Sequence, residues 1–449
     1  MTTFTLKDFQ KIGRVENFTT DASGVSTDSR SVQAGQAFFA IKGENFDGHD
    51  FVKAAFEKQA AIGVVSESWF AQNGKNFPAK SFVVTSDPLK ALQNLAKLHR
   101  LKFDASVIAV TGSNGKTTCK EMIQAVVSPS YETLATQGNL NNEIGVPLTL
   151  LRMNESTQMA IIEMGADKKG DIALLCDIAK PDSGVITNIG KAHVGNFGNI
   201  ETVAATKAEL FDALTDDGVR YVNVDDPRLR QHADRKKGLV TFGIEQEADY
   251  RGNILSIDEK ARVRLKITTP EHYELTMQLQ TPGKHQAYNA LIACAIGCSI
   301  DLDFHDITAA IEAYRPLSNR MGLRERNGYT VIDDTYNASP ESMRAAIESL
   351  ATMSTAGRKI AVLSDMLELG NESANEHYKL GEFLKTQHID HIMITGKESA
   401  KIKEGNSAAQ FFNTKHELID ALKKIVKTGD AILVKGSRGM KMEEIVEAL

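Results

Sequence analysis

The stretch SVIAVTGSNGKTTCKEMI, residues 106–123, places an apolar strand, a glycine-containing turn and a helix in immediate succession. Such a turn can direct several backbone N–H groups and the positive end of the helix toward one anion. The standard nucleotide-binding pattern G-x-x-x-x-G-K-[ST] needs glycine at position 110, where this chain has Val110. Gly112 instead supplies the first glycine of a shorter loop. The sequence therefore predicts a tight phosphate-binding loop between strand 106–110 and helix 116–126.

Each part of this loop has a chemical role. Gly112 and Gly115 let the backbone approach phosphate without a Cβ atom in the way. Lys116 supplies a positive charge for the β and γ phosphates, and Thr117 offers a hydroxyl to Mg²⁺. The alternative is a turn that merely carries a lysine, but the full string TGSNGKTT in a strand–loop–helix setting is far more specific. The residues expected to bind the phosphates of a nucleotide are Gly112, Ser113, Asn114, Gly115, Lys116, Thr117 and Thr118.

Two further side chains are candidates for binding Mg²⁺ beside Thr117, and a lysine is expected on a nearby helix. Glu163 ends the apolar strand MAIIEMG, where an acid beside a phosphate loop can hold a metal ion. His193 follows the next strand in the loop KAHVGNFG, and Lys207 lies in the predicted helix 200–215. Taken alone, each also fits a simpler alternative: a solvated strand end, a polar surface loop and a solvated helix lysine. The pattern favours a magnesium site at Thr117 and Glu163, with His193 as a candidate ligand of a second metal ion.

Length and composition narrow the class of protein. The 449 residues suggest about three domains, and the 42% apolar, 24% charged and 6% aromatic content is typical of a soluble globular protein. A net charge of −6 with no basic block gives no indication of a nucleic-acid partner or a polybasic membrane contact. The N-terminus has no secretory signal pattern, and no apolar stretch reaches the ~20 residues that span a bilayer. The four cysteines form no CxxC pair, so we expect reduced thiols and a cytoplasmic protein.

The order of predicted elements divides the chain into domains 1–104, 105–315 and 316–449. Strands are expected at QAFFAI, IGVVS and SFVVT in the first, SVIAVTG, MAIIEMG, SGVITNIG and VRYVNVDD in the second, and TVIDD, KIAVLSD, HIMITG and AILVKG in the third. In the second domain these strands alternate with helices near 171–180, 200–215 and 284–299, which predicts a parallel sheet covered on both faces. An antiparallel hairpin, ARVRLKITT…YELTMQLQT, is expected near its end. The helical stretch PLKALQNLAKLHRLK is interpreted as a connector between the first two domains.

The loop TGSNGKT resembles that of the ATP-dependent Mur ligases and of folylpolyglutamate synthetases, which share the shortened form. The segments STDSRSVQAGQAFFAIKGENFDGHDFV, GNLNNEIGVP, IDDTYNASPESM, DMLELG and VKGSRGMKME are similar to Mur ligases over essentially the whole chain and in family order. The resemblance implies an α/β fold of three domains: a small UDP-binding N-terminal domain, a central parallel-sheet P-loop ATPase domain and a C-terminal Rossmann-like domain. It also implies amide bond formation, in which ATP phosphorylates a carboxylate to an acyl phosphate that an amine then attacks.

The same resemblance implies roles for individual residues. Lys116, Glu163, His193, Lys207 and Arg320 would be catalytic, and Thr117, Glu163, His193 and Lys207 would bind metal, Lys207 as a carbamate formed with CO₂. His285, Asn289, Arg320 and Asp333 would join the phosphate loop in binding ATP. The substrate-binding residues would be Ser29, Arg30, Asn45, Asp47 and His49 at the uridine end, together with Asn141, Asn142, Asp334, Tyr336, Asn337, Ser437 and Arg438.

The segments DDTYNASP and GNLNNEIG favour the branch of the family that adds D-alanyl-D-alanine to a UDP-muramoyl-tripeptide, with ATP and Mg²⁺ as cofactors. That branch serves peptidoglycan synthesis, and through it cell-wall formation, cell shape and cell division. We expect small-molecule substrates, no nucleic acid, no membrane insertion and a monomer. Whether the tripeptide ends in diaminopimelate or lysine stays open, as does the group that takes the amine proton.

Two departures from the family pattern and one competing motif bear on this interpretation. NRMG stands where Gly-Arg is usual, and Ser364 replaces a common glycine, but neither change removes a chemical group. DDPR at 225–228 is similar to the motif by which a sister ligase binds its diamino acid, but it follows a strand of the second domain instead of lying in the third. We interpret it as a strand-end turn at which Pro227 stops the ladder. The alternatives are a sister ligase that adds a diamino acid or glutamate, a folylpolyglutamate-synthetase-like ligase, and a regulatory P-loop ATPase.

Overall fold

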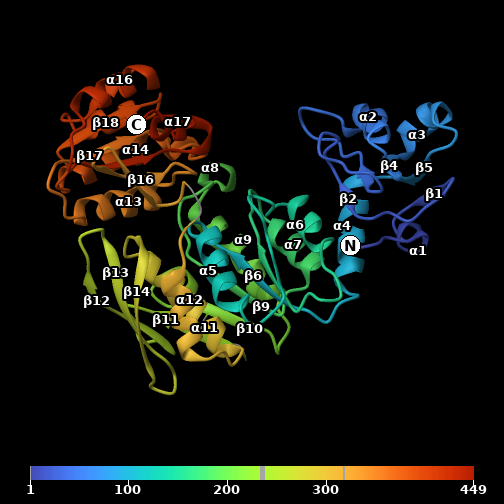
Figure 1. The fold of residues 1–449 in the computed structure, drawn as a ribbon, viewed down its shortest axis with the longest axis horizontal. Helices are drawn as coiled ribbons and strands as arrows, with labels where there is room; N and C mark the ends of the chain where they lie inside the picture. The colour runs from blue at the N-terminus through green and yellow to red at the C-terminus, as the bar shows by residue number, and fades with distance from the viewer. Residues whose placement is uncertain (1, 233–237, 317–318) are drawn as a thin grey trace.

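The structure, a computed structural model, describes residues 2–232, 238–316 and 319–449. Three β-sheets of five, nine and six strands follow one another along the chain, each with helices packed against it. Figure 1 shows them as three bodies, coloured blue, cyan through green to yellow-orange, and orange to red. The predicted α/β class with three domains is confirmed. Among the described helices, none is both long and apolar enough to cross a bilayer.

The first sheet lies at the N-terminus and contains all three strands predicted there. Its order is β1-β5-β4-β3-β2, with β1 antiparallel to β5 and the other pairs parallel. Strands β4 and β5 are almost continuously apolar because both of their faces are covered. The elements are α1 (Leu6–Gln10), β1 (Arg14–Glu16), β2 (Val25–Ser26), β3 (Ala37–Phe39), η1 (Gly48–Phe51), α2 (Val52–Glu57), β4 (Ile62–Ser66), α3 (Glu67–Asn73), η2 (Gly74–Asn76) and β5 (Ser81–Thr85).

Helix α4 (Pro88–Arg100) joins the first two sheets. Asp87 caps its N-terminus by accepting hydrogen bonds from two backbone N–H groups, and Pro88 occupies the first helical position. The helix packs against α6 (Gly145–Leu150) and α7 (Asp171–Ala179) of the central domain. Its apolar face belongs to one hydrophobic core that contains residues of both domains. This stretch is thus the connector that the sequence predicts, and its apolar spacing also buries it between the two domains.

The central sheet carries the predicted phosphate loop at its middle. Its order is β14-β13-β12-β11-β10-β9-β6-β8-β7. All neighbouring pairs among β12, β11, β10, β9, β6, β8 and β7 are parallel, whereas β12–β13 and β13–β14 are antiparallel. The predicted hairpin is β13–β14, and β12, which the sequence did not single out, extends it to three strands. The elements are β6 (Ser106–Thr111), α5 (Lys116–Val127), β7 (Thr133–Ala135), β8 (Met159–Glu163), β9 (Ser183–Ile186), α8 (Val194–Phe197), α9 (Ile200–Ala213), β10 (Val219–Asn223), α10 (Pro227–Arg230), β11 (Leu239–Gly243), β12 (Tyr250–Ile257), β13 (Arg262–Thr268), β14 (Glu274–Pro282), α11 (Gln286–Ser299) and α12 (Phe304–Ala313).

The register of the central sheet decides what surrounds the loop. Val110 at the end of β6 pairs with Glu163 at the end of β8, and Thr111 pairs with Ile186 of β9. Because these strands are parallel, their carboxyl ends meet at one edge of the sheet. The DDPR segment lies at the same end of β10, where Asp226 caps α10 and Pro227 takes its first position. It therefore begins a short helix in the second domain and is more than a turn.

The third sheet has the order β15-β16-β20-β17-β18-β19, parallel except for β15 at its edge. All four strands predicted for this domain are present in it. The elements are β15 (Gly322–Arg326), β16 (Tyr329–Asp334), α13 (Pro340–Thr352), β17 (Lys359–Leu363), η3 (Gly370–Glu372), α14 (Ser373–Lys385), β18 (His391–Thr395), α15 (Ala400–Gly405), β19 (Gln410–Phe412), α16 (Lys415–Ile425), β20 (Ala431–Lys435), η4 (Arg438–Met440) and α17 (Glu443–Ala448).

Among the described residues, backbone–backbone hydrogen bonds join the C-terminal domain to the central domain at two places. The turn between β12 and β13 contacts it, since the Ser354 N–H donates to the Glu259 carbonyl over 2.8 Å. At the other place the Gly195 N–H, in α8, donates to the Glu368 carbonyl over 3.0 Å. Figure 1 shows both contacts, with the β12–β13 end beneath α13 and α8 beside the orange-red domain. The phosphate loop therefore faces the C-terminal domain.

Candidate active site

A cavity of about 620 Å³ lies between the central and C-terminal domains. The phosphate loop, the ends of β8 and β9 and the start of α11 form one side, and the segments before and at the start of α13 form the other. The predicted site residues that line it are Ser113, Asn114, Gly115, Lys116, Thr117, Thr118, Asn141, Asn142, Glu163, His193, Lys207, His285, Asn289, Arg320, Asp334, Tyr336 and Asn337. Residues more than 200 positions apart in the sequence are thus brought together.

The phosphate loop has the tight form that its sequence predicts. Gly112 has φ +145°, and a Cβ there would lie 1.9 Å from the Thr187 hydroxyl oxygen, so no other residue fits. Gly115 ends the loop in the left-handed region at φ +79°, and no side chain caps α5. The first N–H groups of α5 therefore have no side-chain acceptor at the helix cap, which is the arrangement that binds an anion.

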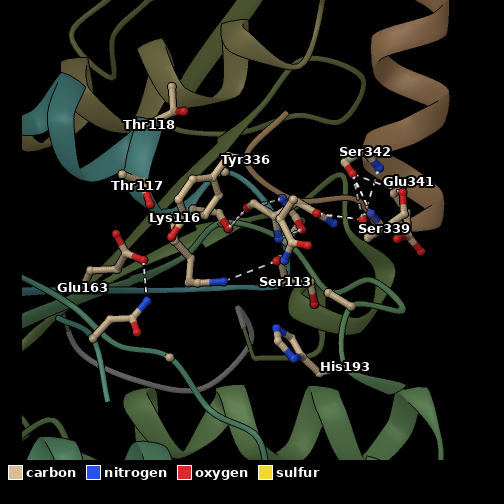
Figure 2. A pocket seen from close by; sticks show the side chains of 18 of the residues that line it. Ser113, Lys116, Thr117, Thr118, Glu163, His193, Tyr336, Ser339, Glu341 and Ser342 are labelled. Atoms are coloured by element: carbon tan, nitrogen blue, oxygen red, sulfur yellow. Dashed lines mark hydrogen bonds between the residues drawn. The ribbon is translucent and has the colours of Figure 1, made fainter. Parts of the chain in front are cut away.

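Lys116 turns back onto the loop that precedes it. Its Nζ donates to the Gly112 carbonyl over 2.9 Å. It also donates to the Ser113 carbonyl over 3.3 Å (Figure 2). Burial lowers the pKa of this amine, an effect that the nearby Glu163 partly opposes. These contacts of the Lys116 ammonium are with neutral carbonyls. The negative charge of a bound phosphate would therefore stabilise its positive charge.

Glu163 is buried and only half satisfied. Its Oε1 accepts a hydrogen bond of 2.8 Å from the Asn141 amide (Figure 2). Its backbone N–H donates to the Thr136 hydroxyl over 3.0 Å. Its Oε2 is buried without a hydrogen-bond partner among the described residues. A buried carboxylate oxygen in this state is costly unless a cation or donor arrives. Asn141, predicted to touch substrate, thus orients the predicted metal ligand.

His193 and Lys207 lie at the same cavity with different surroundings. His193 has φ +59°, and its Nδ1 lies 2.7 Å from a carboxylate oxygen of Glu368 and 3.2 Å from one of Asp167. Burial, and next the charge of Lys116, lower the pKa of the Lys207 amine to about 7. Among the described residues, no three His, Cys, Asp or Glu side chains are grouped closely enough to hold a metal ion. Glu163 and His193 therefore do not form a ready-made metal cage in the described parts of the chain.

The residues predicted to bind the nucleotide base lie beside the phosphate loop. A Cβ at Gly115 would lie 3.4 Å from the Asn289 amide oxygen, and the Asn289 Nδ2 donates to Gln286 over 3.0 Å. The His285 Nε2 lies 3.0 Å from the Gln286 amide nitrogen. Burial lowers the pKa of His285 to about 4, so its ring is neutral at pH 7. A neutral ring can accept a hydrogen bond as well as donate one.

An arginine and a tyrosine form the C-terminal wall of the cavity. The Arg320 guanidinium lies 3.7 Å from the Tyr336 ring centroid, and that of Arg438 lies 5.1 Å from it. Asp334 and Lys435 are partners on adjacent strands, with 2.5 Å between the Lys435 Nζ and the Asp334 Oδ2. The lining of this wall therefore includes one paired cation, Lys435, and one ring-stacked cation, Arg320.

Four predicted residues of these two domains lie outside the cavity lining: Gly112, Asp333, Ser437 and Arg438. The Asp333 carboxylate is fully buried, 2.6 Å from the Arg324 guanidinium, and accepts from the Thr335 hydroxyl. The Ser437 hydroxyl accepts from the Leu367 N–H over 2.8 Å. The contacts seen for Asp333 and Ser437 are therefore contacts that hold the C-terminal domain together.

The sequence did not single out several residues that line the cavity: Asn188, Asp167, Ser339, Glu341, Leu367 and Lys435. Lys435 could have been found, because it ends the predicted strand AILVKG at the same sheet edge as Asp334. Ser339 caps α13, and its hydroxyl also donates to the Asn114 Oδ1 over 2.8 Å. That second bond crosses the domain boundary, and no local sequence pattern indicates it.

The residues predicted for the uridine end lie in the N-terminal domain, away from this cavity. Ser29, Arg30 and Asn45 are on partly or fully exposed loops, and Arg30 pairs with Asp28 over 2.7 Å. The Ser66 N–H donates to the His49 Nε2 over 2.9 Å, so the His49 Nδ1 carries the proton that it directs to Asp47, 2.6 Å away. Both ring nitrogens of His49 are thus engaged within the domain. Beside them, Phe46 is 60% exposed.

Comparisons with known proteins cover each of the three domains. A family model described as "Mur ligase family, catalytic domain" matches residues 21–100, "Mur ligase middle domain" matches 110–297, and "Mur ligase, glutamate ligase domain" matches 319–438. The UDP-N-acetylmuramoyl-tripeptide--D-alanyl-D-alanine ligase of Bacillus subtilis (strain 168) is 38% identical over 95% of this chain and 93% of its own length. The chain belongs to the Mur ligase family.

Other Mur ligases agree in sequence and in structure. The enzyme of the same name from Escherichia coli (strain K12) is 34% identical over 97% of this chain and 96% of its own length. A crystal structure of MurF from Acinetobacter baumannii superposes with a TM-score of 0.91 at 30% identity, covering 99% of this chain and 98% of that one. MurF ligase from Thermotoga maritima, solved in complex with ADP, gives a TM-score of 0.82 at 28% identity over 95% of this chain and 96% of that one.

Proposed function

We propose that this Mur ligase joins D-alanyl-D-alanine to a UDP-N-acetylmuramoyl-tripeptide, with conversion of ATP to ADP and phosphate, as a cytoplasmic monomer in peptidoglycan precursor synthesis. The observation that carries the proposal is the shared cavity, where the phosphate loop faces the segment 334–342 of the C-terminal domain. A ligase must hold triphosphate, carboxylate and amine together, whereas an ATPase needs only the first. Similarity to UDP-N-acetylmuramoyl-tripeptide--D-alanyl-D-alanine ligases over 95% or more of the chain supports the choice of amine.

Each domain would bind one substrate. Domain 1–104 would bind the UDP end of the tripeptide substrate through Ser29, Arg30 and Asn45, with Asp47 and His49 shaping the loop by their mutual contact. Domain 105–315 would bind ATP, and domain 316–449 the dipeptide. The residues proposed for the dipeptide and acyl end are Asn142, Asp334, Tyr336, Asn337, Ser437 and Arg438.

The chemistry begins with two anions that repel each other. An oxygen of the tripeptide carboxylate attacks the γ-phosphorus, the bond to the β-phosphate oxygen breaks, and ADP leaves. The amine of the dipeptide then attacks the acyl carbon and phosphate leaves as the amide forms. Lys116 and Arg320 would offset the repulsion, because cations in a buried site stabilise developing phosphate charge more strongly than they do in water.

The residues present fit Mg²⁺. The Glu163 Oε2 is buried without a hydrogen-bond partner among the described residues. Thr117, which carries the hydroxyl, is the second residue of helix α5. When bound, Mg²⁺ would neutralise phosphate charge and act as a Lewis acid. Glu163 and Thr117 would hold one ion, with His193 directed toward a second.

Lys207 fits a carbamate for a related reason. With a pKa of about 7, much of its amine is neutral at pH 7 and able to attack CO₂. The product is an anion in place of a cation, and it gives the oxygen ligand that a hard metal ion prefers. As a cation, Lys207 is repelled by the positive charge of Lys116, whereas its carbamate would be attracted by that charge.

The test is acceptor dependence. ADP release is followed with ATP, Mg²⁺ and the UDP-muramoyl-tripeptide ending in either diaminopimelate or lysine, with and without D-alanyl-D-alanine. Sustained release is expected only when the dipeptide is present. Release that is unchanged without it would indicate a regulatory ATPase, and release driven by a free diamino acid or glutamate would indicate a sister ligase.

A further inference from the structure

We propose that Lys191 is a positioning residue: it fixes the C-terminal domain on the central domain and so sets where the amine-binding segment lies relative to the phosphate loop. The inference rests on the proposed function. Lys191 follows β9 in the loop that also carries His193, but it is absent from the residues that line the cavity. Its effect on the reaction must therefore pass through the residues it contacts.

Lys191 binds three carboxylates of the other domain. Its Nζ lies 2.8 Å from the Glu376 Oε1 and 3.3 Å from the Glu372 Oε2, and its backbone N–H donates to the Glu341 Oε1 over 3.0 Å. The Glu376 side chain is only 4% exposed. A buried carboxylate whose charge is met from across a domain boundary holds that boundary more firmly than an exposed pair would.

The backbone around Lys191 is shaped for close contact. A Cβ at Gly190 would lie 2.9 Å from the Glu341 carboxylate, and a Cβ at Gly195 would lie 2.6 Å from the Gly370 nitrogen. Both distances are shorter than real Cβ contacts, so the domains meet backbone to backbone at Gly195 and backbone to side chain at Gly190. The segment 190–195 therefore forms a surface fitted to the C-terminal domain.

The contacts lead directly to the amine side of the cavity. Glu341 lies in the first turn of α13, and Ser339, which caps that helix, donates to Asn114 of the phosphate loop. Figure 2 shows Ser339, Glu341 and Ser342 together at the start of this helix, beside the loop. The segment 334–337, proposed to bind the dipeptide, immediately precedes it. Lys191 thus fixes α13 to the central domain at Glu341, four residues after that segment ends.

The chain offers a matched control. Lys379 also pairs with Glu376, with 3.5 Å between its Nζ and the Glu376 Oε1, but it does so from the same helix. Lys379→Met removes one cation from the same carboxylate without touching the domain boundary. Lys191→Arg keeps the positive charge at the boundary, and Glu376→Gln removes the negative charge that it meets.

The experiment compares these variants in the full-length enzyme. For Lys191→Met we expect kcat/KM for D-alanyl-D-alanine to fall about 10- to 100-fold, the scale at which small misplacements act. Glu376→Gln should reproduce the fall, Lys191→Arg should recover most of it, and Lys379→Met should leave it unchanged. ATP affinity, measured by calorimetry without the other substrates, should stay the same in all four, which also shows that each variant folds.

The outcomes separate the two proposals. Wild-type ADP release that needs no dipeptide contradicts the proposed function. If wild type needs the dipeptide but Lys191→Met behaves like Lys379→Met, the ligase stands and the role of Lys191 is wrong. Loss of ATP affinity in Lys191→Met would overturn the positioning role as well, because it would make Lys191 part of the nucleotide site.

Discussion

The N-terminal loops and the interdomain cavity were both predicted as binding sites, yet their polar groups are in opposite states. In the N-terminal domain, both ring nitrogens of His49 are engaged and Arg30 is paired. In the cavity, the Glu163 Oε2 is buried without a partner among the described residues, and the Lys116 pKa is lowered by burial. Satisfied groups hold a local fold, whereas buried unsatisfied ones destabilise the free protein until a ligand meets them. The cavity is therefore the part of the chain built for chemistry.

Replacing Lys116 should separate activity from stability most clearly. Lys116→Met is expected to lower kcat/KM about 10³-fold, because a cation that stabilises the transferring phosphoryl group is lost. Stability to urea should stay the same or rise, since a buried amine with a lowered pKa is removed. Steady-state ADP release and urea unfolding measure the two effects. A Lys116→Met enzyme that unfolds at lower urea concentration than wild type but keeps its kcat/KM would contradict this prediction.

Glu163→Gln tests the carboxylate oxygen that has no hydrogen-bond partner among the described residues. The variant keeps an acceptor for Asn141 but loses the charge, so the Mg²⁺ concentration for half-maximal activity should rise about 10- to 100-fold. The free energy of unfolding without ligands should not fall. A Mg²⁺ titration of ADP release in wild type and variant provides the measurement, and an unchanged half-saturation point would remove Glu163 from the metal site.

The N-terminal domain should respond in the opposite way. His49→Ala leaves the Ser66 N–H and the Asp47 carboxylate without their partner, which should cost about 1–3 kcal/mol in the free energy of unfolding. At saturating substrates kcat should be little changed, because the ring lies outside the cavity. Urea unfolding and kcat measure this pair of effects. A collapse of kcat with unchanged stability would show that His49 has a catalytic part.

The smallest expected effect is a pH dependence at His285. Burial lowers the pKa of His285 to about 4, whereas a histidine in the unfolded chain titrates near 6.5. Between these values the unfolded chain binds the extra proton, so the stability rises with pH from about 4 to 6.5 and is lost as the pH falls. His285→Gln should flatten this slope by less than ~1.4 kcal/mol per pH unit. Urea unfolding of both proteins at several pH values measures the difference, and equal slopes would contradict it.

The sequence predicted best those features whose cause is local. The phosphate loop follows from Gly112 and Lys116 between an apolar strand and a helix, and the buried strands β6, β8 and β20 follow from continuous apolar runs. Strands β2, β7 and β19 have only two or three residues and exist because a neighbour pairs with them, so no local pattern announces them. The packed position of α4 was missed for the same reason, since its partners lie 50 to 80 residues further along the chain.

The site shows the same division. Resemblance and strand ends brought Glu163, Lys207 and Asp334 to one cavity correctly. The hydrogen bonds that orient them were not predicted: Asn141 holds Glu163, and Ser339 reaches Asn114 from another domain. Such contacts join residues that are far apart in the sequence, so no short segment of sequence predicts them. The proposed role of Lys191 could be found only from the structure.

The central claim is that the tripeptide carboxylate is activated by transfer of the γ-phosphoryl group. Its most direct test uses UDP-muramoyl-tripeptide with ¹⁸O in both oxygens of the terminal carboxylate, followed by mass analysis of the phosphate released in the presence of D-alanyl-D-alanine. The acyl-phosphate route predicts one ¹⁸O in each phosphate and the other in the new amide carbonyl. Phosphate that carries no ¹⁸O from the substrate would contradict the account.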